Sequence, residues 1–351
     1  MPEIPAKPLR IVIAGCGGMS GTWIRHTLER QDCRIVGLVD LVVENARAIA
    51  EKYHLDSVVI GSDLKQIIRE TQASLVFNLA VPQAHREIAL TAFGEGCAVF
   101  SEKPLAADLQ QADEMIQAAA AADRAFSIMQ NRRYLMPIRA FRQLLAGGTI
   151  GDIGYLGADF FLGPHFGGFR DLMASPLLLD MAIHTFDQAR LITGADAVAV
   201  YCHEFNPPGS WYRGNASAIA IFEMSNRAVF CYRGSWCAEG CPTSWEADWR
   251  ATGSRGTALW DGRNMPYAEI LADPDPAADS AGVPGLMRRY QHVNAAADWT
   301  GREGHAGCLD EMFTALLNGQ PSETRAADNR HSLAMVMAAI ESARTGRRLM
   351  I

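Results

Sequence analysis

The sequence has 351 residues, of which 49% are hydrophobic and 20% charged, and its net charge is −7. This length allows about two domains, and the composition excludes a chain that is mainly disordered. The acidic balance argues against nucleic acid and anionic membrane as partners, because both are recognised by basic surfaces. No apolar run approaches the roughly 18 residues of a membrane span.

The N-terminus and the cysteines indicate the compartment. The first ten residues are polar and rich in proline, and the apolar run 11–14 is too brief for the core of a signal peptide. The eight cysteines are scattered, as is typical of free thiols in a reducing environment, so we expect a cytoplasmic protein. Cys231, Cys237 and Cys241 cluster, but they lack a CxxC pair and a histidine at zinc-site spacing, and no metal is expected.

Strands and helices alternate over the first third of the chain. The expected strands cover 10–14, 34–39, 57–60, 74–79, 98–100 and 125–129. The expected helices cover 22–30, 43–53, 63–70, 83–94 and 108–122. This alternation predicts an α/β fold with a doubly wound parallel sheet and right-handed crossovers. The ligand site of such a sheet lies outside the carboxyl ends of its strands.

The pattern then changes to consecutive strands, which favours a large and mostly antiparallel sheet. A helix over 137–146 ends at Gly147. Further strands are expected over 155–162, 197–204, 216–224, 228–236, 246–252 and 257–260, with one helix over 177–192. An acidic loop rich in proline covers 272–285, and helices close the chain over 305–318 and 326–344. We therefore expect a first domain over 1–133 and a second over 134–351.

A glycine-rich turn follows the first expected strand and opens a helix. Its pattern is G-x-G-x-x-S, from Gly15 to Ser20. Gly15 permits a tight turn, Gly17 lets the backbone approach a pyrophosphate, and the helix N-terminus offers free N–H groups. Asp40 ends the next strand, where a carboxylate can bind both ribose hydroxyls and repel a 2′-phosphate. These features predict NAD rather than NADP as the cofactor, although the glycines also suit a plain turn and Asp40 a solvated strand end.

Glu102-Lys103-Pro104 follows the strand over 98–100, at the edge where a parallel sheet places its site. A lysine there can hold a substrate oxygen or, with a lowered pKa, transfer a proton. The alternative interpretation of Lys103 is a solvated charge at a strand end.

Asp180, His184 and Asp187 recur on one face of an otherwise apolar helix. Ionisable groups on such a helix face a cavity or a buried partner, because burial without a partner is costly. An imidazole oriented by a carboxylate one turn earlier is a plausible acid–base pair. A core histidine held by its neighbours and a His/Asp/Asp metal site are the alternatives.

Together these motifs resemble those of the glucose–fructose oxidoreductase, inositol dehydrogenase and MocA (Gfo/Idh/MocA) family of nicotinamide-dependent oxidoreductases. The similarity covers nearly the whole chain. In the family's order the sequence has GCGGM, VPQAH at 81–85, EKP at 102–104, NRRY at 131–134, G-x-I-G at 148–151, D-x-x-x-H at 180–184 and ESARTG at 341–346. The resemblance implies a Rossmann domain followed by an α/β domain with an open, mostly antiparallel sheet.

The resemblance also implies the site residues. Lys103, Asp180 and His184 are the expected catalytic residues: His184 is the general base oriented by Asp180, and Lys103 stabilises the reacting oxygen. Some members are thought to use the lysine as the base, so the roles of Lys103 and His184 remain exchangeable. The expected substrate residues are Lys103, Arg132, His165, Asp180 and His184. The expected cofactor residues are Gly15, Cys16, Gly17, Gly18, Met19, Asp40, Ala80, Val81, Pro82, His85, Glu102, Lys103 and Gln130.

The sequence departs from the family pattern near the helix that carries Asp180. Ala174-Ser175-Pro176 stands where a glycine cluster is common, and Ala182 replaces a frequent glycine. Val81 also replaces a common threonine before Pro82. The expected catalytic residues are present. We therefore expect these departures to change the wall of the substrate pocket and hence which substrate it accepts.

Three functions are compatible with these residues. The first is an NAD-dependent oxidoreductase that moves a hydride between a secondary hydroxyl of a sugar, polyol or glycoside and nicotinamide C4. The second is a glycosidase that oxidises its sugar transiently, eliminates the aglycone and returns the hydride. The third is a dinucleotide-sensing protein without catalysis, which would not need Lys103, Asp180 and His184. Because an open sheet face needs covering, a homodimer or homotetramer is expected.

Overall fold

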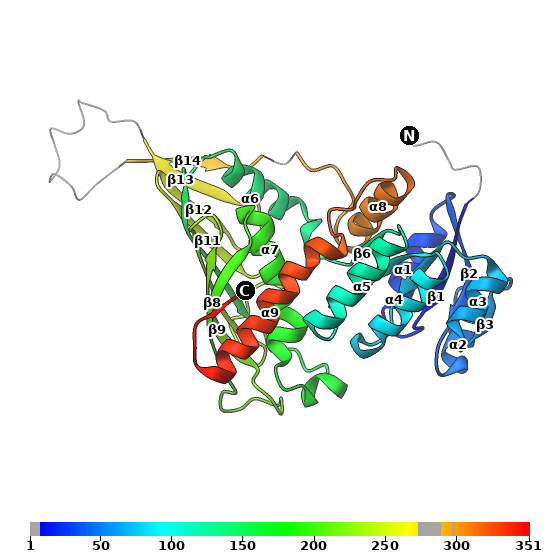
Figure 1. The fold of residues 1–351 in the computed structure, drawn as a ribbon. Coiled ribbons are helices and arrows are strands. Elements are labelled where there is room, and N and C mark those ends of the chain that lie inside the picture. Colours follow the sequence, from blue (N-terminus) through cyan, green and yellow to red (C-terminus); the bar gives the residue numbers. More distant parts are fainter. Residues whose placement is uncertain (1–7, 273–288, 297) are drawn as a thin grey trace, which may run out of the picture. The chain divides into compact units, whose positions relative to one another are not determined.

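The computed structural model describes residues 8–272, 289–296 and 298–351, and the chain divides into two compact units (Figure 1). Unit 1 comprises Met1–Asn131 and Arg302–Leu333, and unit 2 comprises Arg132–Gly301 and Ala334–Ile351. The expected division after residue 133 differs from this one, because the chain returns to unit 1 over Arg302–Leu333. The expected acidic loop over 272–285 lies, apart from Ala272, outside the described residues.

Unit 1 is built on a parallel sheet that, in the described part of the chain, has six strands in the order β3-β2-β1-β4-β5-β6. The strands are β1 (Leu9–Ala14), β2 (Cys33–Val39), β3 (Val59–Gly61), β4 (Leu75–Asn78), β5 (Ala98–Ser101) and β6 (Phe126–Ile128). The helices are α1 (Ser20–Leu28), α2 (Val43–Lys52), α3 (Leu64–Thr71), α4 (His85–Gly94), α5 (Leu109–Ala121), α8 (Gly304–Leu317) and the start of α9 (Ala326–Thr345). The prediction of a doubly wound parallel sheet is confirmed.

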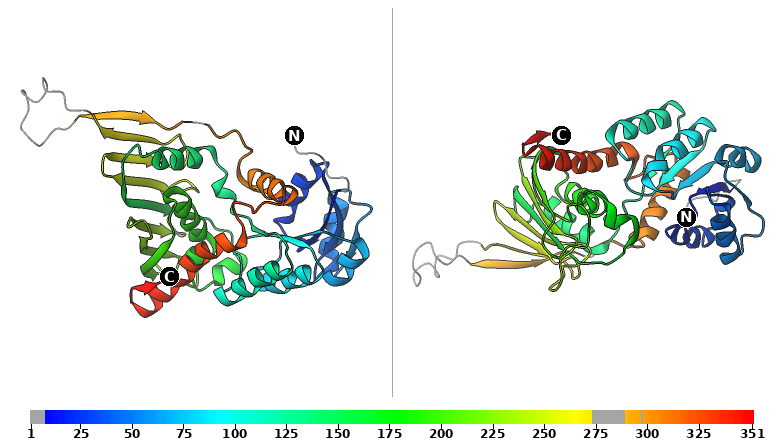
Figure 2. Two further views of the ribbon diagram at one scale, coloured as in Figure 1. Left: turned by 45° about the horizontal axis from the view of Figure 1, so that its top comes forward. Right: turned by 90° about the horizontal axis from the view of Figure 1, so that it is seen from below.

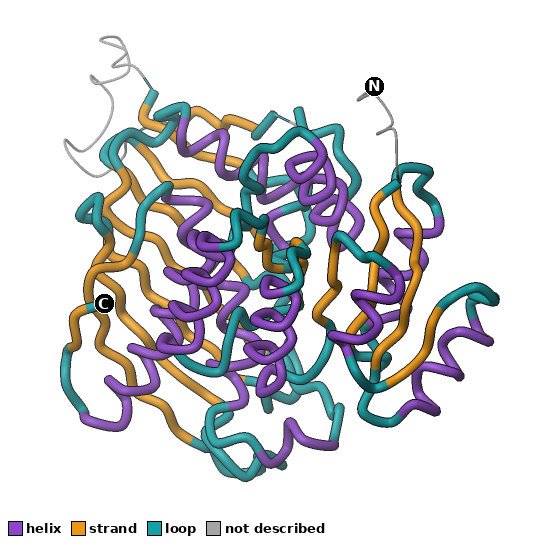
Figure 3. Tube along the Cα trace, turned by 45° about the vertical axis from the view of Figure 1, so that its right-hand side comes forward, coloured by secondary structure: helices purple, strands orange, loops and turns teal. Residues whose placement is uncertain are grey.

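Aromatic residues of α1, α8 and the central strands form a buried cluster in unit 1. Figure 3 shows the helices of the chain packed beside its strands. Trp23 of α1 packs edge-on against Phe77 of β4 at 4.8 Å between ring centroids. Phe313 of α8 packs in the same way on Phe100 of β5 at 5.4 Å. All four side chains are fully buried. This packing against the central strands accounts for the return of the chain to unit 1, because burying such rings contributes a few kcal/mol each.

Two helices of unit 1 begin at aspartates that cap them. The Asp63 carboxylate accepts a hydrogen bond from the Gln66 backbone N–H at 2.9 Å, and Asp108 accepts one from Gln111 at 2.8 Å. Each cap satisfies an N–H group that the first helical turn leaves open. The chain thus enters α3 and α5 at defined residues, which fixes where the preceding loops end.

Unit 2 contains a sheet that, over the same described residues, has nine strands in the order β14-β13-β12-β11-β7-β10-β9-β8-β15. Its strands are β7 (Ile153–Phe161), β8 (Ala197–Phe205), β9 (Ser217–Met224), β10 (Val229–Ser235), β11 (Asp248–Gly253), β12 (Gly256–Trp260), β13 (Tyr267–Leu271), β14 (Tyr290–Asn294) and β15 (Leu349–Met350). Its helices are α6 (Met136–Ala146), α7 (Ile183–Thr193) and the end of α9. The expected antiparallel pairing is confirmed for every described pair except β7 with β10, which run parallel.

Helices cover one face of this sheet and leave the other open (Figure 2). Phe186 of α7 packs on Phe222 of β9 and on Tyr232 of β10, with ring centroids 4.8 and 5.2 Å apart. At the edge, the Ser342 hydroxyl of α9 accepts a hydrogen bond from the Cys202 N–H of β8 at 2.9 Å. The opposite face carries exposed apolar side chains, among them Ile219 and Ile221 of β9. This alternation along β9 is typical of a strand with one covered face.

None of the helices in the described ranges is long and apolar enough to cross a lipid bilayer.

Candidate active site

The expected cofactor residues of unit 1 all follow the carboxyl ends of its parallel strands. The glycine loop follows β1, Asp40 follows β2, residues 80–85 follow β4, Glu102 follows β5 and Gln130 follows β6. Strands β1 and β4 are neighbours although β2 and β3 lie between them in the sequence. The strand order thus reverses at β1 and β4, and such a switch point is where open α/β sheets bind their ligands.

At Gly15 the glycine loop lies against the loop after β4, whereas Gly17 and Gly18 border open space. Gly15 has a φ of +99°, and a Cβ atom there would lie 2.5 Å from the Ala80 nitrogen. A Cβ atom at Gly17 or Gly18 would meet nothing within 4 Å. Gly15 is therefore required by the turn itself, whereas Gly17 and Gly18 border open space before the N-terminus of α1. That space fits the approach of a pyrophosphate.

The Asp40 carboxylate binds the glycine loop. Its Oδ2 accepts a hydrogen bond from the Cys16 N–H at 2.9 Å, and its Oδ1 accepts bonds from the Val42 N–H at 2.9 Å and the Asn45 amide at 3.2 Å. Burial, together with the Asp40 charge, raises the pKa of Cys16 to about 12, so this side chain stays a neutral thiol. Asp40 is only partly exposed, and its two oxygens retain capacity for a further donor such as a ribose hydroxyl.

A cavity of about 370 Å³ adjoins this loop. Its lining residues come from the loop, from α1 and from α2, and are Cys16, Gly17, Gly18, Gly21, Arg25, Asn45, Ile49, Lys52 and Tyr53. The cavity lies between the glycine loop and the helix that follows Asp40, as a site for one half of a dinucleotide requires.

His85 positions two of the surrounding loops. It is fully buried, with Nδ1 2.9 Å from the Pro104 carbonyl and Nε2 3.1 Å from the Ala80 carbonyl. Burial lowers the pKa of His85. Its carbonyl accepts a hydrogen bond from the Asn78 amide at 2.9 Å. The side chain thus connects the loop after β4 to the loop after β5.

The loop after β5 carries Glu102 and Lys103, and the Lys103–Pro104 peptide is cis. Glu102 is 8% exposed, and its Oε1 accepts a hydrogen bond from the Trp23 indole of α1 at 2.8 Å. Glu102 is thereby held against α1, whereas Lys103 is partly exposed at the strand edge. The backbone of Lys103 thus lies just beyond the carboxyl end of β5, where its N–H donates a hydrogen bond to Glu102 Oε2 at 3.3 Å.

Two buried polar side-chain atoms near the carboxyl ends of β4 and β6 are available to bind a ligand. Among the described residues, Asn78 Oδ1 and Gln130 Nε2 are buried without a hydrogen-bond partner. Asn78 ends β4, and Gln130 follows β6. A buried polar atom without a partner costs free energy, so a bound cofactor with a donor and an acceptor would satisfy these atoms. The donor set of unit 1 thus fits a dinucleotide.

We expect Asp40→Ala to reduce the preference for NAD over NADP about ten-fold or more, because the carboxylate no longer repels a 2′-phosphate. The measurement is calorimetric titration of the protein with each dinucleotide, which needs no turnover. Asp40→Asn is the matched control, since it removes the charge and keeps an oxygen that can accept from Cys16 N–H. If the ratio of the two dissociation constants is unchanged in both variants, Asp40 does not bind the ribose hydroxyls of the cofactor.

In unit 2, the candidate catalytic helix begins with a widened turn. Residues Leu177–Ala182 form a π-helical turn before α7, where the sequence predicts a continuous α-helix. Asp180 lies in this turn, its side chain is 12% exposed, and its Oδ2 accepts a hydrogen bond from Arg170 Nε at 2.6 Å. π-turns inside helices are frequent at functional sites. The turn places Asp180 against the loop that carries Arg170.

His184 lies one turn further along, on the buried part of α7. It is 6% exposed, and every residue from Ile183 to Ile192 is buried. Asp180 and His184 are thus four residues apart, with Asp180 in the π-helical turn and His184 in the α-helix that continues it.

Asp187, the third ionisable residue of this helix face, has a structural role. Arg133 binds it through two hydrogen bonds of 2.6 Å each, and both side chains are buried. Arg190 also approaches it, with 3.8 Å between Nη1 and Oδ1. A bidentate pair of this kind anchors α7 to the start of unit 2. Of the two arginines in NRRY, Arg133 is therefore the structural one.

The Arg132 side chain belongs to a polar cluster that includes Glu246 and Gln188 of α7. Its side chain is 11% exposed, its Nη1 donates to the Trp245 carbonyl, and its Nε lies 3.7 Å from Glu246 Oε1. Gln188 of α7 donates to the other Glu246 oxygen at 2.7 Å. Burial raises the pKa of Glu246, and the nearby Arg132 charge opposes that rise. Arg132 is therefore already bound by protein groups.

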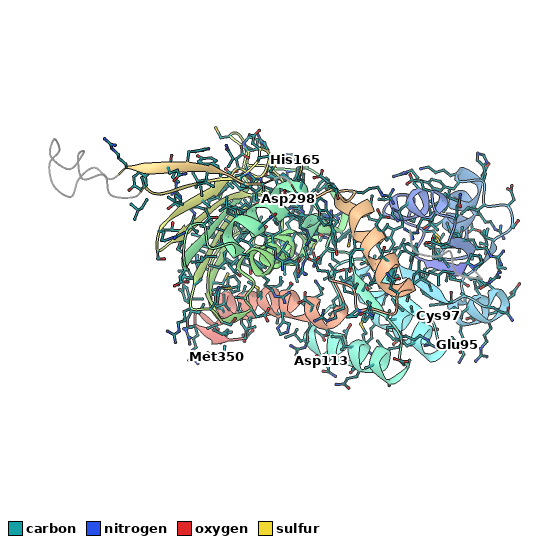
Figure 4. All side chains as sticks on the ribbon, turned by 90° about the horizontal axis from the view of Figure 1, so that it is seen from above. Glu95, Cys97, Asp113, His165, Asp298 and Met350 are labelled. Atoms are coloured by element: carbon teal, nitrogen blue, oxygen red, sulfur yellow. The ribbon has the colours of Figure 1, made fainter. Side chains whose placement is uncertain are left out.

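His165 lies at the surface of unit 2. Its side chain, which is labelled in Figure 4, is 63% exposed. It stacks on Trp211 with 3.7 Å between ring centroids and lies 2.9 Å from Glu239 Oε1. These partners belong to loops at the end of the sheet. The described contacts of His165 do not include Asp180 or His184.

A second acidic group lies next to the unusual segment before the catalytic helix. Ser175, which lies just before the π-helical turn, donates a hydrogen bond to Glu204 Oε2 of β8 at 3.0 Å. Burial raises the pKa of Glu204 to about 7, and the Ser175 bond partly opposes the rise. The departure at Ser175 thus connects this segment to the sheet.

No group of three or more His, Cys, Asp or Glu side chains that could hold a metal occurs among the described residues. The cysteines are free thiols, and Cys231, Cys237 and Cys241 are at least partly exposed. The hypothesis of a His/Asp/Asp metal site is weakened by Asp187, whose carboxylate Arg133 occupies.

A parallel sheet with this glycine loop at its switch point defines a dinucleotide-binding Rossmann protein. A model of an oxidoreductase family with an NAD-binding Rossmann fold matches residues 9–130, and a model of the GFO/IDH/MocA C-terminal domain matches residues 138–259. The chain therefore belongs to the Gfo/Idh/MocA family of oxidoreductases, and its cofactor is NAD.

Relatives of the chain include several sugar dehydrogenases. D-apiose dehydrogenase of Rhizobium rhizogenes is 22% identical over 348 residues, which are 97% of this chain and 96% of that protein. D-glucoside 3-dehydrogenase of Escherichia coli is 28% identical over 212 residues, which are 58% of this chain and 60% of that protein. An oxidoreductase from Agrobacterium radiobacter, solved with NAD+, L-tartaric acid and magnesium, has a TM-score of 0.83 at 20% identity over 98% of both chains. At this identity the structural similarity shows a shared fold.

Arg170 is not among the site residues predicted from the sequence. It lies in the short helix Gly168–Leu172 and binds Asp180, ten residues later in the chain. No motif marks it, and the apolar residues beside it give no periodic signal. The polar cluster of Gln188 and Glu246 was missed for the same reason.

Proposed function

We propose that this protein is an NAD-dependent dehydrogenase that oxidises a secondary hydroxyl of a sugar, polyol or glycoside. The observation that carries the proposal is the partly buried Asp180 and His184 on one apolar helix, in a chain of this family that also has Lys103 at a strand end. A protein that only senses a dinucleotide has no need of these residues.

We assign the proton transfer to His184. Its imidazole accepts the proton of the substrate hydroxyl, and Asp180 supports the imidazolium that forms. Asp180 is itself held by Arg170, which fixes the carboxylate. Lys103 donates a hydrogen bond to the reacting oxygen and stabilises its developing charge. NAD, when bound, supplies the acceptor for the hydride that leaves the same carbon.

The glycine loop, Asp40 and the residues after β4, β5 and β6 are the proposed cofactor contacts. His85 and Glu102 act as positioning residues, because their side chains bind protein groups. On the substrate side we propose Arg132 and His165 as residues at the border of the pocket. The Arg132 guanidinium can donate to a substrate hydroxyl, and the His165 imidazole can donate or accept, without breaking the pair of Arg170 and Asp180.

The experiment is a screen of polyols, free sugars and glycosides with NAD, in which NADH and organic products are followed together. Stoichiometric NADH and keto product support the proposal. Aglycone release without accumulation of NADH would replace it by a glycosidase that oxidises its sugar transiently. Tight NAD binding with no turnover on the whole panel would leave a dinucleotide-sensing protein.

We also propose that copies of the chain associate as a homodimer or homotetramer through the open face of the unit 2 sheet. Tyr201, Ile219 and Ile221 are exposed there, and contiguous apolar surface of this kind marks interfaces. We expect light scattering to give a mass of two or four chains and Ile221→Lys to lower it. Leu28→Lys on α1, at a comparably exposed site outside the sheet, is the control. A monomer mass for the unaltered protein contradicts the proposal.

We propose the cytoplasm as its compartment, because all eight cysteines are free thiols, as reducing conditions require. Cell fractionation with an antibody to the protein tests this, and recovery outside the cytoplasmic fraction would contradict it.

A further inference from the structure

Three large aromatic side chains of unit 2 lie half exposed beside the pair of Arg170 and Asp180. Phe166 and Phe169, in the loop after β7, are 56% and 57% exposed, and Trp245, before β11, is 43% exposed. The Phe166 and Trp245 ring centroids are 6.2 Å apart. The Arg170 guanidinium carbon lies 5.5 Å from the Phe166 centroid and 4.7 Å from that of Phe169. We call Phe166, Phe169 and Trp245 the aromatic shelf.

Buried rings support the shelf from behind. Phe166 packs edge-on against Trp236 at 6.1 Å, and Trp236 is fully buried and stacks on Tyr212 at 5.8 Å. Trp245 contacts the buried Phe160 at 6.4 Å. Rings packed in this way have few alternative rotamers, so their exposed faces are already arranged for a partner.

Arg170 connects the aromatic shelf to the Asp180 carboxylate through cation–π contacts with the rings and a hydrogen bond to the carboxylate. Arg170, which lies over both phenylalanine rings, donates to Asp180 at 2.6 Å. At the other end of the shelf, Arg132 donates to the Trp245 carbonyl. A molecule whose hydroxyl reaches Asp180 therefore also approaches Arg170 and the two phenylalanine rings that this arginine contacts.

The chemistry of the shelf distinguishes between possible substrates. The many hydroxyls of a free sugar or polyol need hydrogen-bond partners when they leave water, but the arginines nearest the shelf are bound to Asp180, Glu246 and the Trp245 carbonyl. Exposed aromatic faces instead favour a flat, apolar group, which stacks at 4.5–7 Å between ring centroids. Contiguous exposed apolar surface beside a polar site is also typical of ligand grooves.

We infer that the substrate is a glycoside with an aromatic aglycone, which packs on Phe166, Phe169 and Trp245 while a sugar hydroxyl reacts at Asp180 and His184. This inference rests on the proposed function and adds the substrate class to it. A protein partner on the shelf is the competing occupant, but it would cover the approach to Asp180 and so obstruct turnover.

The test compares methyl and phenyl glycosides of the same sugar, with NAD and the full-length protein. We expect kcat/KM to be about ten-fold or more higher for the phenyl glycoside, the size of effect that burial of one ring gives. Phe169→Ala and Trp245→Ala should each lower this phenyl-to-methyl ratio toward one. Trp245→Ala keeps the main-chain carbonyl that Arg132 binds, so it separates the ring from the polar cluster.

Tyr290→Ala on β14, 59% exposed, is the matched control and should leave the ratio unchanged. Equal kcat/KM for both glycosides in the unaltered protein overturns the inference, as does a ratio that neither shelf variant changes. A lower assembly mass in the shelf variants also overturns it, because the shelf would then be a protein interface.

Calorimetry with the phenyl and methyl glycosides keeps the two proposals distinguishable. If neither glycoside is oxidised but the phenyl glycoside binds more tightly and Phe169→Ala abolishes the difference, the shelf assignment stands and the dehydrogenase proposal fails. If sugars are oxidised and no difference in binding exists, the proposed function stands and the shelf assignment is wrong.

Discussion

We expect His184→Ala to lower kcat for the oxidation of the best substrate by about 10²–10⁴-fold, the usual contribution of a positioned general base. The imidazole lies 6% exposed on a helix whose neighbouring residues are buried. Water therefore replaces it poorly as a base, because little water reaches a site enclosed in this way. The measurement is steady-state NADH formation at saturating substrate and NAD.

His203→Ala is the control for this variant, because His203 is an exposed histidine on β8 of the same unit. NAD binding and the thermal unfolding midpoint should be retained in both variants. Near-full turnover in His184→Ala, with the fold intact, would show that another group is the base.

The second expected result concerns Lys103, whose replacement by alanine should lower kcat by about 10²–10³-fold, as removal of one preorganised donor does. Lys103→Arg separates the two roles that the sequence leaves open. An arginine keeps the charge and the hydrogen bonds but is not deprotonated in proteins. Partial recovery in Lys103→Arg indicates electrostatic stabilisation, whereas loss as deep as in Lys103→Ala indicates that the lysine transfers the proton.

Lys65→Ala is the matched control, since Lys65 is a solvated lysine of α3 that lies 3.5 Å from Glu95 on the surface of unit 1 (Figure 4). A surface pair of this kind contributes at most about 1 kcal/mol. Equal and small effects of Lys103→Ala and Lys65→Ala on kcat would refute the assignment of Lys103.

Much of unit 1 could be predicted because its signals are local. The β-branched runs and the helices between them are short-range patterns, and the glycines of the loop satisfy a conformational need of their own segment. The surroundings of His85 could not be predicted in this way. His85 contacts two protein carbonyls with its ring nitrogens, and these acceptors come from loops that the sequence cannot bring together.

The short edge strands of unit 2 were not predicted from the sequence. Strands β13, β14 and β15 are absent from the expected elements. β15 has two residues, and Leu349 pairs with Val200, far away in the chain. Such strands are stabilised by backbone hydrogen bonds to a neighbouring strand, and their own residues carry little periodicity. The π-turn at Asp180 was missed because one extra residue in a helical turn leaves the apolar pattern almost unchanged.

The sequence by itself determined the alternating strands and helices of unit 1 and the dinucleotide loop, and it made Lys103, Asp180 and His184 candidates. The strands, helices and loop follow from periodicity and spacing within short segments. Only the tertiary structure decided that Arg133 holds Asp187, that Arg170 holds Asp180, and that Phe166, Phe169 and Trp245 lie together. The physical reason is that each of these contacts joins side chains from separate segments, and only the packing of the helices and loops on the sheet decides which of them meet.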